Sequence, residues 1–260
     1  MTNLSLRVAA FVVNATLAIA SVTAFAADLP VRALPAGAPL FSWTGFYIGT
    51  HAGGGVLLDQ GYSPQGLVAD RHGLGALAGG QIGANYQVGM FVVGIEGEGF
   101  WSGMKVTRDQ FINAGSLDAN LLGGTASIRN AWDFDVAGRF GVAIERALIY
   151  GKAGWVSARF GWNSMEFNCG TRCINDQGSA KLDGLLIGIG LEYAFINNWT
   201  AKFEYDYLGF GAKNVVFTST CLTPGVCVPS DTFTHTQSAS ADKHVFKVAL
   251  NYLFNPGAMK

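Results

Sequence analysis

Residues 244–254 read HVFKVALNYLF, a stretch in which apolar and polar side chains alternate. Every second residue is apolar or aromatic: Phe246, Val248, Leu250, Tyr252 and Phe254. Lys247 and Asn251 lie between them. Successive side chains of a β-strand point to opposite faces, so the stretch predicts a strand with one apolar face and one polar face. Such a strand suits either a soluble sandwich or a barrel in lipid.

Seven further stretches repeat this alternation, each about as long as the ~9–11 residues that a tilted membrane strand needs. They are FYIGTHAGG (46–54), GGQIGANYQ (79–87), FVVGIEGEGFW (91–101), WDFDVAGRFGVAI (132–144), LIYGKAGWVSARF (148–160), LLIGIGLEYAF (185–195) and WTAKFEYDY (199–207). Together with residues 244–254 they predict eight strands.

The two faces of these strands favour a barrel in lipid. One face places Trp, Tyr and Phe near the strand ends with aliphatic side chains between them, as aromatic girdles flank an apolar belt. The other face is mostly glycine with isolated charges of both signs, which fits a narrow lumen. Charged residues make up only 13% of the 260 residues, against roughly 25% in average soluble domains.

The connections between the strands alternate between short and long. Short ones fall around residue 89, at 145–146 and at 196–198. Long ones cover residues 55–73, 104–129, 163–180 and 213–241. This order predicts an all-β fold, an eight-stranded antiparallel transmembrane up-and-down β-barrel with short periplasmic turns and long extracellular loops.

The N-terminus predicts export. Residues 1–26 combine Arg7, a long apolar run and an Ala24-Phe25-Ala26 cleavage site, the pattern of a secretory signal peptide. We expect a Pro-rich leader at residues 27–42, the barrel at 43–254 and a tail at 255–260. The expected location is the cell outer membrane.

Several motifs resemble a known family. AFAADLP, WTGFYIG, GGQIGANYQ, VVGIEGE, GLEYAFINNWTAKFEYDYLGFG and FKVALNYLF are similar to the small major outer-membrane proteins of rhizobia-like alphaproteobacteria, also called the porin-family or outer-membrane immunogenic β-barrel family. The resemblance implies an OmpA-like barrel with variable surface loops. It also implies that Tyr252 and Phe254 form a terminal-strand signal for the barrel assembly machinery, although six residues follow Phe254 here. Some relatives are described as haemin-binding and others as weak porins.

Eleven charged residues are predicted to share the lumen. They are Glu96, Glu98, Asp133, Asp135, Arg139, Lys152, Glu192, Lys202, Glu204, Asp206 and Lys247. They could line an ion path, but a barrel of ~8 strands has room for little beyond side chains. Unpaired buried charges are costly, so we expect these residues to pair and fill the lumen.

The four cysteines predict disulfides, because an exported chain folds in an oxidising compartment. Of the three possible pairings, the two local ones are favoured, Cys169–Cys173 and Cys221–Cys227. The four histidines are scattered: His51 takes a lumen position, His72 and His235 fall in loops, and His244 begins a strand.

These observations predict a non-enzymatic outer-membrane barrel with a structural and surface role. Two alternatives stay open, a low-conductance porin for small solutes and a haemin-binding surface protein. No cofactor or metal is expected. The expected partners are outer-membrane lipid, lipopolysaccharide and the assembly machinery, with haemin or small solutes as further candidates. The net charge of −1 gives no reason to expect nucleic acid.

Overall fold

The computed structural model describes residues 41–59, 71–112, 122–167, 174–222 and 232–254, which all lie in one compact unit, Leu40–Lys260. The strands are β1 Gly45–Asp59, β2 Arg71–Val88, β3 Phe91–Ser102, β4 Lys105–Ile112, β5 Leu122–Ile144, β6 Ala147–Phe167, β7 Ile174–Ile196, β8 Trp199–Cys221 and β9 Thr232–Phe254. No helix among these residues is long and apolar enough to cross a membrane. The expected signal peptide, most of the leader and the tail lie outside the described residues.

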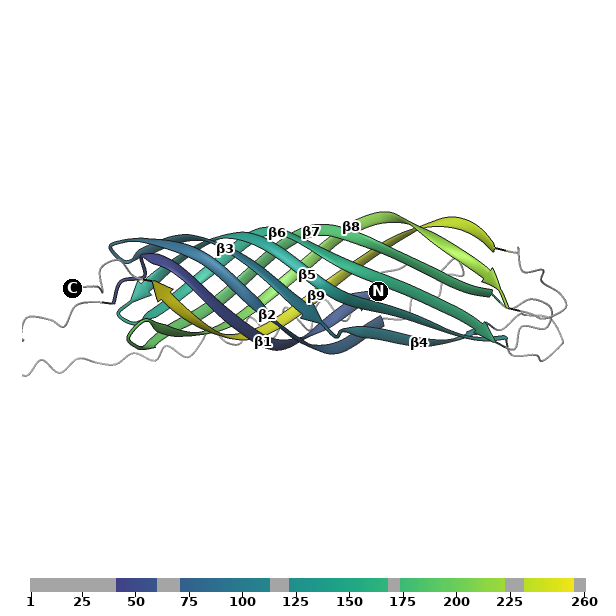
Figure 1. Ribbon diagram of the computed structural model, residues 1–260, viewed down its shortest axis with the longest axis horizontal. Coiled ribbons are helices and arrows are strands. Elements are labelled where there is room, and N and C mark those ends of the chain that lie inside the picture. Colours follow the sequence, from purple (N-terminus) through teal and green to yellow (C-terminus); the bar gives the residue numbers. More distant parts are fainter. Residues whose placement is uncertain (1–40, 60–70, 113–121, 168–173, 223–231, 255–260) are drawn as a thin grey trace, which may run out of the picture. The chain divides into compact units, whose positions relative to one another are not determined.

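The strands form one closed antiparallel ring. Neighbours in sequence pair from β1 to β3 and from β5 to β9, while β1 pairs with β9 and β3 with β5. The strands wind obliquely around this ring (Figure 1). A closed ring pairs its backbone groups internally and leaves no free edge, which is what a strand-built membrane protein requires. The prediction of an all-β antiparallel barrel is confirmed.

The predicted count of eight strands differs from the structure, which has nine strands in the described residues. The extra strand is β4, which follows β3 after only two residues, and both pair with β5. Across the interruption the Gly103 N–H donates to the Ala76 carbonyl, and the Asn130 N–H donates to the Met104 carbonyl. Backbone pairing therefore continues on both sides, and β3 and β4 together occupy one of eight positions in the ring.

The expected long loops are much shorter than predicted. Pairing continues from Leu58 to His72, and β4 lies within the span expected to be a loop. β8 and β9 remain paired as far as Thr220 and Thr232. The sequence pattern missed these extensions because the two faces exchange character there: apolar side chains such as Leu57, Val106 and Ile128 face the lumen, and polar side chains such as Lys105 and Arg129 face outward.

Three short turns mark one end of the ring, here named the turn end, and the opposite end is the loop end. The turns lie at the predicted positions, between β2 and β3, β5 and β6, and β7 and β8. Each places one residue at a positive φ: Gly89 at 60°, Glu145 at 53° and Asn197 at 44°. Glycine and asparagine tolerate this backbone conformation, which a tight hairpin requires.

The outer surface carries an apolar belt between two levels of aromatic side chains. Phe91 and Trp101 mark its two limits on β3, with Val93 and Ile95 exposed between them. These limits are ten residues apart, and at about 3.3 Å per residue and a tilt of about 40° they lie about 25 Å apart along the axis. This height matches the apolar band of outer-membrane barrels.

Candidate functional site

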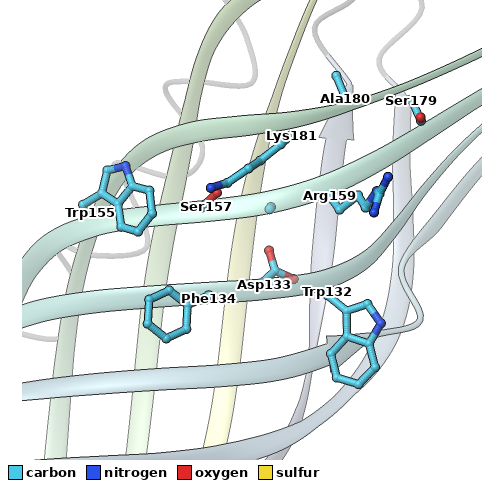
Figure 2. A pocket seen from close by; sticks show the side chains of 10 residues that line it. Trp132, Asp133, Phe134, Trp155, Ser157, Arg159, Ser179, Ala180 and Lys181 are labelled. Carbon is cyan, nitrogen blue, oxygen red and sulfur yellow. The ribbon is translucent and has the colours of Figure 1, made fainter.

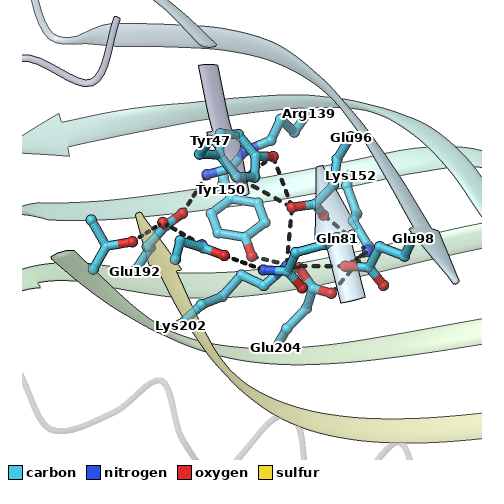
Figure 3. Close-up of polar contacts among 12 residues, drawn as sticks. Tyr47, Gln81, Glu96, Glu98, Arg139, Tyr150, Lys152, Glu192, Lys202 and Glu204 are labelled. Atoms are coloured by element: carbon cyan, nitrogen blue, oxygen red, sulfur yellow. Dashed lines mark hydrogen bonds and ion pairs between the residues drawn. The ribbon is translucent and has the colours of Figure 1, made fainter. Parts of the chain in front are cut away.

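The structure places all eleven charged residues of the predicted network inside the ring, each between 0% and 3% exposed. Figure 3 shows many of them converging from different strands on one region of the lumen. Lys243 is also buried there. The sequence pattern missed Lys243 because the last strand was expected to begin at residue 244, although Lys243 shares the inward phase of Lys247 on β9.

Three lysines hold the middle of the lumen against four carboxylates. Lys202 Nζ lies 3.0 Å from Glu98, 3.1 Å from Glu96 and 3.3 Å from Glu204. Because each ammonium contacts several carboxylates, these side chains act as one unit, here named the central network. Its members are Lys152, Lys202, Lys247, Glu96, Glu98, Glu204 and Asp206.

The other two lysines approach from different sides of the ring. Lys152 on β6 lies 2.8 Å from Glu204 and 3.5 Å from Asp206. Lys247 on β9 lies 2.6 Å from Asp206 and 2.9 Å from Glu204, and it also pairs with Glu98. Opposite charges at these distances in a dry interior offset much of the desolvation cost of each group.

Arg139 on β5 extends the central network toward the turn end. Its Nη2 donates to Glu192 at 2.7 Å, and its Nη1 donates to the Tyr47 hydroxyl at 3.0 Å and lies 3.5 Å from Glu96. The guanidinium also lies 4.1 Å from the centre of the Tyr150 ring. Arg139 therefore joins ion pairs and ring contacts from several strands.

Two tyrosines complete these contacts, and the sequence analysis did not identify them as part of the site. The Tyr47 hydroxyl donates to Glu96 at 2.8 Å, and the Tyr150 hydroxyl donates to Glu204 at 2.5 Å. Each tyrosine lies opposite a glycine on the next strand, Gly83 and Gly190 respectively. A Cβ at either glycine would lie within 2.4 Å of the tyrosine ring, so these glycines make room for large side chains.

Apolar side chains close the lumen on the loop side of the central network, which corrects the expectation of a mostly glycine inner face. Phe100, Phe160 and Phe210 are buried there together with leucines, valines and Met104. Lys243 pairs with Asp133 beside these rings, and its ammonium lies 5.5–5.8 Å from the three ring centres. We name this set the loop-side apolar layer.

A second apolar set closes the turn end. Trp43, just before β1, is buried with Val92, Leu148, Tyr150 and Ala194. We name this set the turn-side apolar layer. The charged groups therefore lie between two layers that exclude water, where the local dielectric is low and every ion pair is strengthened.

The buried charges do not balance within the described residues. Seven carboxylates face five cations, which leaves a formal charge of −2. Asp135 is the clearest case, since it is fully buried and neither of its side-chain oxygens has a hydrogen-bond partner. An unsatisfied buried carboxylate lowers the free energy of unfolding, so Asp135 destabilises the folded barrel.

Glu96, Glu98 and Glu204 are grouped closely enough to hold a cation, because one oxygen of each lies within 4.8 Å of the others. The ammonium of Lys202 already lies 3.0–3.3 Å from all three carboxylates. The donor set therefore fits the protein's own cation, and it gives no reason to add a metal.

The histidines do not converge. His51 is buried in the lumen, where its Nδ1 lies 2.9 Å from Gln81 and its ring packs edge-on against Phe100. His72 and His235 lie on β2 and β9, which corrects their expected placement in loops. His244 Nδ1 lies 2.7 Å from the Tyr205 hydroxyl.

The chain ends and cysteines are only partly described. Tyr252 and Phe254 end β9 as an edge-to-face pair with ring centres 4.9 Å apart. Cys221 ends β8 and carries no free thiol. Cys169, Cys173 and Cys227 lie outside the described residues, so both local pairings stay predictions.

Comparisons with known proteins agree with this architecture. The profile of the family described as "Outer membrane protein beta-barrel domain" matches residues 14–254. The chain is 32% identical over 253 residues to a 31 kDa outer-membrane immunogenic protein of Brucella melitensis, covering 91% of this chain and 96% of that protein. It is 29% identical over 194 residues to a 22 kDa outer membrane protein of Rhizobium leguminosarum bv. viciae, covering 73% and 72%.

Solved structures of outer-membrane proteins also align with the chain, at low identity. The outer membrane protease OmpT from Escherichia coli aligns with a TM-score of 0.43 and 10% identity, over 82% of this chain and 98% of that one. Neisserial surface protein A aligns with a TM-score of 0.39 and 11% identity, over 81% and 98%.

Proposed function

The chain belongs to the outer membrane protein β-barrel domain family, and on that premise we propose that it is an integral outer-membrane protein with a structural and surface role and a closed lumen. The observation that carries the proposal is the filling of the lumen. A paired charge network lies between two buried apolar layers, so no open path is needed to account for the inward charges.

The energetics support closure. Opening a pore through the central network would separate Lys202 from Glu96 and Glu98 and leave buried charges without partners, which typically costs several kcal/mol. The loop-side apolar layer adds a second barrier, because a hydrophobic constriction excludes water and ions. Both barriers would have to open together for steady conduction.

The surface role rests on the ends of the ring. We place the turn end in the periplasm and the loop end outside the cell, because short turns and longer connections divide in this way in outer-membrane barrels. The relatives named outer-membrane immunogenic proteins support exposure of the loop end. On this reading Tyr252 and Phe254 present the terminal strand to the assembly machinery.

Recording currents across planar bilayers tests the closed lumen. The refolded full chain should insert and show no steady conductance, while its heat-modifiable migration in SDS gels shows that the same sample is folded. A stable, cation-selective channel in the unmodified, folded protein would overturn the proposal.

One observation favours the second candidate, a low-conductance porin. The formal charge of −2 and the unpaired Asp135 would attract small cations if the apolar layers opened. Replacing Asp135 by Asn separates the two functions, since it should reduce the cation selectivity of a true pore and leave a closed barrel without conductance.

A further inference from the structure

Two pairs of like charges face each other across neighbouring strands on the outer surface. Lys105 on β4 lies directly opposite Arg129 on β5. Arg159 on β6 lies directly opposite Lys181 on β7. Cβ atoms of directly opposed residues are about 4.5–5.5 Å apart, and like charges at such positions are destabilising. We name these four exposed residues the basic cluster.

The two pairs form one continuous patch. Arg129 lies opposite Gly161, two residues along β6 from Arg159, and such diagonal neighbours are about 7–8 Å apart. A Cβ at Gly161 would meet nothing within 4 Å, so the surface between the two arginines is open. The four cations therefore lie near one another, around the open surface at Gly161.

The protein itself offers these cations little compensation. Within the described residues, the side chains of Lys105, Arg129 and Arg159 have no ion-pair or hydrogen-bond partner. Lys181 lies 3.9 Å from Asp183, with both side chains largely exposed, at 65% and 47%, and its ammonium also lies 5.5 Å from the centre of the Trp155 ring. Such a surface pair contributes little. An anion bound from outside the protein would therefore stabilise the basic cluster.

The cluster lies just beyond the apolar belt, on the loop side. Lys105 follows Trp101 by four residues, and Arg159 follows Trp155 by four residues. At about 3.3 Å per residue and a tilt of about 40°, this spacing is about 10 Å along the barrel axis. With an apolar band of about 25 Å in a membrane about 40–45 Å thick, that height is at the outer limit of the polar headgroup region.

A hollow in the outer wall adjoins the cluster. It has a volume of about 730 Å³, and its lining includes Trp132, Phe134, Trp155, Arg159 and Lys181. Figure 2 shows the aromatic rings and the two cations around the same hollow, with Lys181 extending toward Trp155. The Asp133 carboxylate also lines the hollow, and it is paired with Lys243. A second hollow of about 700 Å³ includes Arg129 and also reaches Arg159. Apolar rings beside cations fit an amphiphile, since the rings can contact acyl chains while the cations contact its anionic head.

We propose that the basic cluster and this hollow bind a phosphorylated glycolipid of the outer leaflet, with Arg159 and Lys181 on one phosphate and Lys105 and Arg129 on another. Arginine suits this task because its planar guanidinium donates two parallel hydrogen bonds to a phosphate. The proposal rests on the placement in the outer membrane proposed above. It is independent of conduction, because the cluster faces outward and the central network faces inward.

Native mass spectrometry of the refolded full chain in detergent tests this site, with bis-phosphorylated lipid A as the probe. The unmodified protein should retain the lipid, and R159Q and K181Q should each weaken retention about tenfold or more, because charge-assisted hydrogen bonds are the strong ones. R159K should restore part of the binding. R146Q is the matched control, since Arg146 is an exposed arginine in the turn between β5 and β6, at the opposite end.

Stability gives a second readout that a merely structural role would not produce. Without lipid, R159Q relieves repulsion and should keep or raise the thermal midpoint, whereas with lipid A its midpoint should fall below that of the unmodified protein. K105Q repeats the test on the other pair if R159Q does not fold. Equal retention of dephosphorylated lipid A, equal retention of phosphatidylglycerol, or no difference between R159Q and R146Q would each overturn the proposal.

Discussion

Replacing Arg139 by Ala removes the cation that links the central network to the turn side of the lumen. The change deletes the 2.7 Å contact with Glu192 and the 3.5 Å contact with Glu96. It also removes the donor to the Tyr47 hydroxyl and the cation over the Tyr150 ring. Arg139 lies among buried groups, so water cannot readily replace it.

The expected loss in the free energy of unfolding depends on the contacts that Glu192 and Glu96 keep in R139A. Removing one partner of a buried ion pair typically costs about 3–5 kcal/mol, because the other charge is left uncompensated. Glu192 keeps hydrogen bonds from Thr200 at 2.5 Å and from Asn251 at 2.8 Å. Glu96 keeps Lys202 at 3.1 Å. The loss should therefore lie near the lower limit, about 3 kcal/mol.

Urea unfolding in detergent measures this loss, with the heat-modifiable gel shift reporting the folded fraction. The free energy of unfolding falls linearly with urea, so at equal slopes the midpoint shift gives the change in stability. R146A is the control, because Arg146 is exposed and its Nη1 donates to the Phe195 carbonyl at 3.3 Å, a surface contact whose loss should shift the midpoint far less. Equal midpoints for R139A and R146A would refute the reasoning.

A double variant separates the lost pair from lost packing. In R139A/E192Q the remaining side chain at position 192 is neutral, so the uncompensated charge disappears and part of the stability should return. A double variant no more stable than R139A would show that packing on the tyrosines, and not charge, sets the cost.

Three further outcomes are expected from the same preparation. Replacing Asp135 by Asn should raise stability by about 1 kcal/mol at neutral pH, because the excess buried charge is removed while a buried polar group remains; an unchanged urea midpoint would contradict this. Gly190→Val should destabilise the barrel by about 1–3 kcal/mol through overlap with the Tyr150 ring, while Gly161→Val, which meets open space, should not. Non-reducing mass mapping should find two bridges within single loops, Cys169–Cys173 and Cys221–Cys227, and no free thiol. Bridges between loops would correct this pairing.

The sequence alone determined the fold class and the sidedness of the strands. A strand points successive side chains to opposite faces, so local spacing was enough to assign Glu96, Lys152 and Lys202 to one side of the wall. The same rule located the outward belt and the short turns. It failed on the loop side of the belt, where the apolar side chains, such as Val106, face the lumen and the outward ones, such as Lys105, are polar, and so it missed β4 and Lys243.

Only the tertiary structure decided which of these side chains meet. Lys202 contacts Glu96 across 106 residues of sequence, and the partners of the tyrosines and of Arg159 follow from strand register and ring closure. These are non-local properties, because a shift of one residue between two strands changes every cross-strand neighbour. Whether a side chain faces inward follows from the alternation within its own strand, whereas its ion-pair partner depends on how all the strands close into a ring.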